Sequence, residues 1–188
     1  MFADMFNGFA TLIVGAVAYV TYVLGKRNEK KNAAIMVVMD IREAEQAVNG
    51  IKEYGLSKDS KKPILTNSWS KYKHLFASDL SYDDFVAFNR FFDACINISD
   101  AKDKMENIFY ENISAKIIIV QNKVYENMLS AEVAKKEQKD ITAPIEREVY
   151  TFMANEPGAR ILKSLNLLTN LSATSGYQKL KRIGGIRT

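Results

Sequence analysis

The sequence predicts an all-α protein, with a single N-terminal transmembrane helix followed by a cytoplasmic helical bundle of about five or six helices. Three observations support this class. An uncharged, largely apolar run occupies residues 5–25. In the rest of the chain apolar side chains recur at steps of three and four, as one face of a helix requires. Proline and glycine are sparse, with 3 and 9 among 188 residues, so long stretches lack the usual signals for turns.

The run 5–25 is bounded by charged residues on both sides. At about 1.5 Å per residue a helix of this length reaches roughly 31 Å, which matches the hydrocarbon core of a bilayer. Tyrosines near its end suit the membrane interface, and the lysines and arginines that follow indicate the cytoplasmic side. We therefore expect the tail 1–4 outside and residues 26–188 in the cytoplasm. The expected interface residues are Tyr19, Tyr22, Lys26, Arg27, Lys30 and Lys31.

Two other interpretations of this segment are a cleaved signal peptide and a buried core helix. Ala16-Val17-Ala18 has the composition of a signal-peptide cleavage site, but no lysine or arginine side chain precedes the run, and the run continues past the site, which favours an uncleaved anchor. A buried core helix is disfavoured because such helices seldom run this long without a charge. Thr11 and Gly15 have a small-x-x-x-small spacing that would let two anchors pack together, although small residues are common in membrane helices.

The helical domain, 26–171, begins with a membrane-proximal stalk helix to about residue 54. Its apolar stripe fits a coiled-coil dimer, but it is wider than a two-stranded seam, so a bundle within one chain is favoured. Asn49-Gly50 is expected to interrupt this helix and Gly55 to end it. The seam positions are Ala34, Val37, Ile41, Ala44, Val48 and Ile51.

A polar connection, 55–63, leads to a short aromatic helix at 68–76. Ser81, followed three residues later by Asp84, predicts a helix N-terminus. The polar stretch between 97 and 103 suggests two helices after it, at 82–98 and 100–138, with a single bent helix as the alternative. The β-branched run 117–120 is expected to be the most deeply buried turn of the second helix, because it is too short for a strand without a partner.

Thr142, Ala143 and Pro144 open a further helix. Glu156-Pro157-Gly158 is expected to form a turn, and 159–171 a last amphipathic helix. Residues 172–188 are basic, contain no acidic side chain and are expected to form a flexible tail. Anionic lipid is the expected contact of the tail's basic residues, and a purely solvated tail is the alternative. These residues are Lys179, Lys181, Arg182 and Arg187.

Residues suited to catalysis or metal binding are few. The chain has one histidine, His74, and one cysteine, Cys95, which excludes the usual catalytic triads and structural zinc sites. Cys95 lies on an apolar helix face and is interpreted as a core residue. No glycine-rich phosphate loop, calcium loop or di-iron motif occurs. We therefore expect no enzyme, no metal and no cofactor, with a site built from carboxylates alone left open.

The leading hypothesis is a membrane-tethered, non-enzymatic helical interaction module at the cytoplasmic face. Its partners would be the lipid bilayer and either another protein or a second copy of the chain, with nucleic acid not expected. The alternative is a small membrane effector, of the toxin or defence type, whose anchors oligomerise and perturb the bilayer. A composition rich in lysine and asparagine, together with an uncleaved anchor, indicates a bacterial inner membrane. The biological process and the partner do not follow from the sequence.

Overall fold

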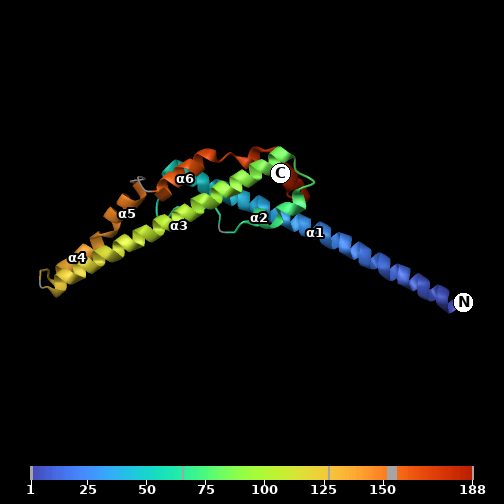
Figure 1. The fold of residues 1–188 in the computed structure, drawn as a ribbon, viewed down its shortest axis with the longest axis horizontal. Helices are drawn as coiled ribbons and strands as arrows, with labels where there is room; N and C mark the ends of the chain where they lie inside the picture. The colour runs from blue at the N-terminus through green and yellow to red at the C-terminus, as the bar shows by residue number, and fades with distance from the viewer. Residues whose placement is uncertain (1, 65, 127, 152–155, 188) are drawn as a thin grey trace.

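Two long helices, α1 (Phe2–Tyr54) and α3 (Tyr82–Tyr125), form the frame of the molecule, and shorter helices pack along them (Figure 1). The structure is a computed structural model that describes residues 2–64, 66–126, 128–151 and 156–187, and their side chains from Leu12 onward except at Thr151. Within these ranges all regular structure is helical, which confirms the predicted class. The shorter elements are α2 (Ser68–Tyr72), η1 (Lys73–Phe76), α4 (Ala131–Asp140), α5 (Thr142–Thr151), α6 (Glu156–Leu167), η2 (Leu171–Ala173) and α7 (Ser175–Gly184).

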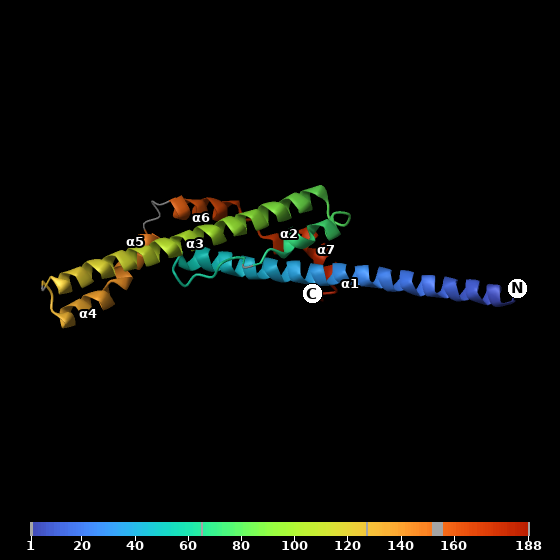
Figure 2. The same ribbon diagram turned by 60° about the horizontal axis from the view of Figure 1, so that its bottom comes forward.

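Helix α1 is continuous from Phe2 to Tyr54, so the stalk is a direct extension of the N-terminal segment (Figure 2). The interruption predicted at Asn49-Gly50 is wrong, since one glycine in a helix costs only about 1 kcal/mol and packing outweighs that. The predicted end is confirmed. Gly55 has φ of +81° and its N–H donates to the carbonyl of Ile51 at 3.0 Å, as a left-handed helix cap does.

The apolar part of α1 that the structure describes is short. Among the helices whose side chains are described, none combines the length and apolarity that a bilayer crossing requires. The described run extends from residue 12 to 25, about 21 Å of helix against the roughly 30 Å of a hydrocarbon core, before charges begin at Lys26. The transmembrane helix predicted over 5–25 is therefore not supported, and the side chains of residues 5–11 lie outside the described part.

Helix α3 is a single helix, so the predicted division into 82–98 and 100–138 is wrong. The polar residues that suggested a break instead hold the connection between α1 and α2. The hydroxyl of Ser99 accepts from the N–H of Ile64 at 3.3 Å and donates to its carbonyl at 3.1 Å. The ammonium of Lys102 donates to the carbonyl of Lys58 at 2.9 Å. Side chains that bind a distant loop leave the helix backbone intact.

The far half of α3 is less buried than predicted. Within the run 117–120 only Val120 is buried, and Ile118 and Ile119 are more than half exposed, so the prediction of a deeply buried turn is wrong. The helix also ends at Tyr125 rather than near 138. Ser130, whose hydroxyl accepts from the N–H of Val133, starts the separate helix α4, which runs back along α3 (Figure 1). This end of the molecule is therefore a two-helix arm.

Two apolar clusters form the core. The first joins α1, α2, η1, η2, α7 and the start of α3, and the second joins the end of α1 to α3, α5 and α6. The aromatic helix predicted at 68–76 is confirmed as α2 and η1, since Trp69 is buried in the first cluster and donates to Asn89 at 2.9 Å. The rings around its indole are Phe76, Phe85, Phe88 and Phe92.

The last part of the chain is helical and packed. Glu156, Pro157 and Gly158 form the first turn of α6 rather than a separate turn, because proline is well tolerated at that position of a helix. The segment predicted as a flexible basic tail, 172–188, forms η2 and α7 and enters the first cluster through Tyr177 and Leu180. We call residues 172–187 the C-terminal segment, and this segment is therefore part of the core.

Candidate binding groove on helix α1

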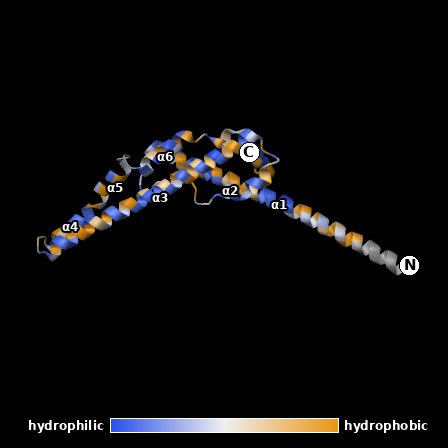
Figure 3. Ribbon diagram, viewed as in Figure 1, coloured by the Kyte–Doolittle hydropathy of each residue, from blue (hydrophilic) through white to orange (hydrophobic). Residues whose placement is uncertain are grey.

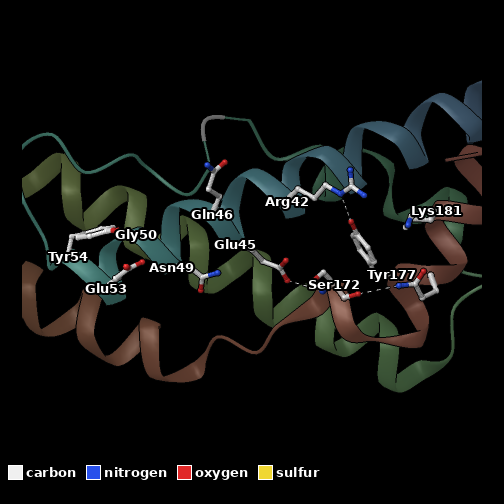
Figure 4. A pocket seen from close by; sticks show the side chains of 11 residues that line it. Arg42, Glu45, Gln46, Asn49, Gly50, Glu53, Tyr54, Ser172, Tyr177 and Lys181 are labelled. Atoms are coloured by element: carbon white, nitrogen blue, oxygen red, sulfur yellow. Dashed lines mark hydrogen bonds between the residues drawn. The ribbon is translucent and has the colours of Figure 1, made fainter. Parts of the chain in front are cut away.

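The C-terminal segment is fixed to α1 by polar contacts (Figure 4). The guanidinium of Arg42 donates to the hydroxyl of Tyr177 at 2.8 Å. The backbone N–H of Ser172 donates to the carboxylate of Glu45 at 2.9 Å, so an acidic side chain of α1 meets the start of η2. Both contacts join residues more than a hundred positions apart and place α7 along the middle of α1.

Asp84 of α3 holds the same segment between these two contacts, at Ser175 and Gly176. Its carboxylate accepts from the hydroxyl of Ser175 and from the N–H of Gly176, both at 3.1 Å, at the first turn of α7. It also accepts from the hydroxyl of Ser81 at 2.8 Å, while the Ser81 hydroxyl caps α3 as predicted. Carboxylates are favourable at helix N-termini because unpaired N–H groups and the helix dipole point there. Asp84 therefore joins α3 to α7.

The pKa of the Asp84 carboxyl is lowered from its ordinary value of 3.8. Burial alone would raise it, but the hydrogen bonds from Ser81, Ser175 and Gly176, together with the nearby charge of Lys179, outweigh burial. A carboxyl with a lowered pKa in the folded state stabilises the fold while ionised. Its contribution is complete above the unfolded pKa and is lost as the pH falls from there through the lower folded pKa.

We expect Asp84→Asn to lower the melting temperature at neutral pH and to flatten its fall as the pH drops below about 4, because the asparagine has no charge to lose. The matched control is Asp83→Asn, which changes the same charge at the exposed neighbouring residue. Melting curves of the three proteins across this pH range test the expectation. Equal acid sensitivity in all three would show that Asp84 does not link pH to the docking of α7.

A cavity of about 740 Å³ lies between the last part of α1 and residues 172–181 of the C-terminal segment (Figure 4). Its wall combines polar and apolar surface and carries both signs of charge, from Arg42 and Lys181 and from Glu45 and Glu53. Two of its charged groups, Arg42 and Glu45, are already used to hold the C-terminal segment. The lining residues are Arg42, Glu45, Gln46, Asn49, Gly50, Glu53, Tyr54, Ser172, Tyr177, Gln178 and Lys181.

A second cavity, of about 840 Å³, lies between the end of α1 and the connection that follows it. Gln46, Gly50 and Tyr54 line both cavities, and their spacing of four residues places them in one row on α1. We call this row the α1 ridge. The side chain of Tyr54 is 82% exposed, and a Cβ at Gly50 would meet nothing within 4 Å. The ridge is thus an open surface with a hollow on each side.

The residues suited to catalysis are not gathered in these cavities. Cys95 is a buried core residue, as predicted, and burial raises the pKa of its thiol to about 12. His74 is exposed on η1. Among the residues that the structure describes, no group of three or more histidine, cysteine or acidic side chains is arranged to hold a metal ion.

The predicted interface residues lie where the free part of α1 enters the folded body. Tyr19 and Tyr22 are exposed. Lys26 pairs with Glu29 at 3.1 Å, and Lys30 pairs with Asp79 at 2.6 Å, which ties α1 to the turn between η1 and α3. Gly15 is open on its side-chain face, and the side chain of Thr11 lies outside the described part. Arg27 and Lys31 are exposed.

The four basic residues predicted to contact lipid differ in their surroundings. Lys179 lies 3.9 Å from Asp84, and Lys181 is buried against the cavity wall. Arg182 and Arg187 are exposed. The sequence reasoning missed the α1 ridge and the role of Asp84. One signal for α7 was present, since Tyr177, Leu180 and Gly184 follow steps of three and four.

Comparison of the chain with models of known protein families, with curated proteins and with solved structures finds no match.

Proposed function

We propose that this chain is a non-enzymatic interaction module, held at the cytoplasmic face of a membrane by the N-terminal part of α1. In this proposal the α1 ridge and its two flanking cavities bind another protein. The observation that carries the proposal is the combination of an unpacked apolar helix at one end of the chain with an open, partly aromatic surface further along the same helix. The proposed location is a bacterial inner membrane.

The free part of α1 supports the tether. Large apolar side chains between residues 12 and 24 are exposed all around the helix rather than along one face, and Figure 3 shows apolar residues along this part of α1 beyond the packed body. A helix that is apolar on every side suits surroundings that are apolar on every side, which lipid provides and a single protein groove does not. These side chains are Leu12, Ile13, Val14, Val17, Tyr19, Val20, Tyr22, Val23 and Leu24.

The α1 ridge supports the protein partner. Exposed tyrosine beside a glycine gives a protruding ring next to a notch, and tyrosine is enriched at the centres of protein interfaces. The flanking cavities carry both signs of charge, including Glu53 on one side and Lys61 on the other. Mixed charge around an aromatic centre resembles the polar rim of a protein interface more than an enclosed small-molecule pocket.

Site-specific photo-crosslinking in cells tests the partner surface. A crosslinking amino acid at Tyr54 should give a discrete adduct with one protein. The control is the same amino acid at Tyr125, which is equally exposed at 85% against 82% but lies on the two-helix arm. Adducts at Tyr125 and none at Tyr54 would move the partner surface to the arm. No discrete adduct at either position would contradict the proposal.

The membrane effector is the second candidate, favoured by the open side-chain face of Gly15, which leaves room for a second anchor to pack. Gly15→Leu would block such packing while keeping the helix apolar. Crosslinked oligomers that disappear in this variant, together with loss of membrane potential on expression of the original chain, would favour the effector over the interaction module.

A further inference from the structure

We propose that a basic collar at the base of the α1 tether binds anionic phospholipid headgroups. We define the collar as Lys26, Arg27 and Lys31 of α1 together with Arg182 and Arg187 of the C-terminal segment. The inference deepens the proposed function and rests on it, because it takes the tether as given and names the lipid chemistry recognised beside it.

The fold brings the two parts of the collar together. A Cβ at Gly184 would lie 3.1 Å from the side chain of Ile35, and a Cβ at Gly185 would lie 3.5 Å from the side-chain Cε of Lys31. The end of α7 therefore runs against α1 at Lys31 and Ile35, shortly after Lys26, the first basic residue of α1. Figure 2 shows the C-terminus beside α1 at the start of its free part.

The C-terminal segment is held in place as far as Ile186. Gly185 adopts φ of +67°, and its N–H donates to the carbonyl of Arg182 at 3.1 Å. The N–H of Ile186 donates to the carbonyl of Lys181 at 2.9 Å, which completes a Schellman-type cap. Ile186 also packs against the first apolar cluster. Arg187 follows Ile186 directly, so it is joined to a residue whose position the cap and the cluster fix.

The collar keeps a positive excess after its internal pairs are counted. Glu29 neutralises Lys26, and Asp79 neutralises the neighbouring Lys30. Among the described residues, no salt bridge involves the remaining basic groups of this region. These groups are Arg27, Lys31, Arg182 and Arg187.

The position of the collar along α1 indicates that its ligand is a lipid headgroup. The collar lies where an apolar helix meets charged residues, which is the level of headgroup phosphates when that helix is in a bilayer. Near an anionic surface each basic residue adds about 1 kcal/mol of attraction, equivalent to about five-fold in partitioning. The collar differs from the set predicted from sequence, because Lys179 faces Asp84 and Lys181 is buried, so neither is free for lipid.

The test uses the full-length chain diluted from detergent into an equal mixture of two vesicle populations of different density. One is pure phosphatidylcholine, and the other contains roughly one part in three of phosphatidylglycerol. After flotation, the ratio of protein on anionic to neutral vesicles is measured. We expect the ratio to favour anionic vesicles and to fall roughly 25-fold in the double variant Arg182→Gln, Arg187→Gln.

The matched control is Lys135→Gln with Lys136→Gln, which removes the same charge from exposed positions on α4, at the end of the molecule away from the N-terminus (Figure 1). Its ratio should equal that of the original chain, and melting curves should show both double variants folded. An equal ratio of protein on anionic to neutral vesicles in all three proteins, with binding to neutral vesicles intact, would contradict lipid recognition by the collar. It would not contradict the proposed tether. No binding to neutral vesicles would overturn the tether itself.

Discussion

Leu180→Ala should destabilise the protein by about 2–5 kcal/mol, the usual cost of truncating a large buried aliphatic side chain. Leu180 is fully buried, at 0% exposure, between α7 and the rest of the first apolar cluster. Losing it leaves a cavity at the point where the C-terminal segment meets α1. Chemical denaturation followed by the fluorescence of Trp69, the single tryptophan, which lies in the same cluster, measures the change directly.

The control for this prediction is Leu167→Ala, which makes the same chemical change at a side chain that is 66% exposed. A surface substitution of this kind changes stability by no more than about 0.5 kcal/mol. A small effect at both positions would mean that residues 172–188 behave in solution as the mobile tail that their composition suggests. The contrast between the two leucines therefore separates a docked C-terminal segment from a free one.

Gly176→Ala should also destabilise, by about 1–3 kcal/mol. A Cβ at this position would lie 2.9 Å from the Cβ and Cγ of Asp84, which is closer than real side-chain atoms approach. The Asp84 carboxylate cannot retreat without losing its hydrogen bonds to Ser175 and to the N–H of Gly176 itself. The substitution therefore forces α7 and α3 apart, and denaturation curves should show the loss.

Gly50→Ala is expected to stabilise the protein and serves as the control for Gly176→Ala. Gly50 lies inside α1, and an added Cβ would meet nothing within 4 Å. Alanine is favoured over glycine in a helix by about 0.5–1 kcal/mol, so this variant should be more stable than the original chain. Destabilisation by both alanines would indicate that the space around Gly176 is not the cause. Opposite signs are expected because only one of the two glycines touches a neighbouring helix.

Features set by adjacent residues could be predicted from the sequence. The cap at Ser81, the left-handed end at Gly55 and the helix start around Pro144 all depend on side chains within a few positions of the affected backbone. The helical period likewise located the buried face of α1, from Ala34 to Ile51. These rules need no knowledge of the rest of the chain, which is why they succeed.

Features set by distant residues could not be predicted in the same way. Ser99 and Lys102 look like helix breakers until their partners, 35 and 44 positions away, are known. The basic composition of the last residues hides the apolar row that packs on α1. The α1 ridge could not be predicted, because the cavities on either side of it exist only after the C-terminal segment and the 55–63 connection have packed on α1.

The docking of α7 on α1 has a consequence for how the protein is made. The contact between Arg42 and Tyr177 joins positions 135 residues apart. At about 5–20 residues per second, a ribosome needs on the order of ten seconds to add that length of chain. Throughout this interval the apolar face of α1, including Val37 and Ile41, has been synthesised without its final partner. Nascent chains are therefore most exposed to chaperone binding or aggregation during this interval, before the first apolar cluster can form.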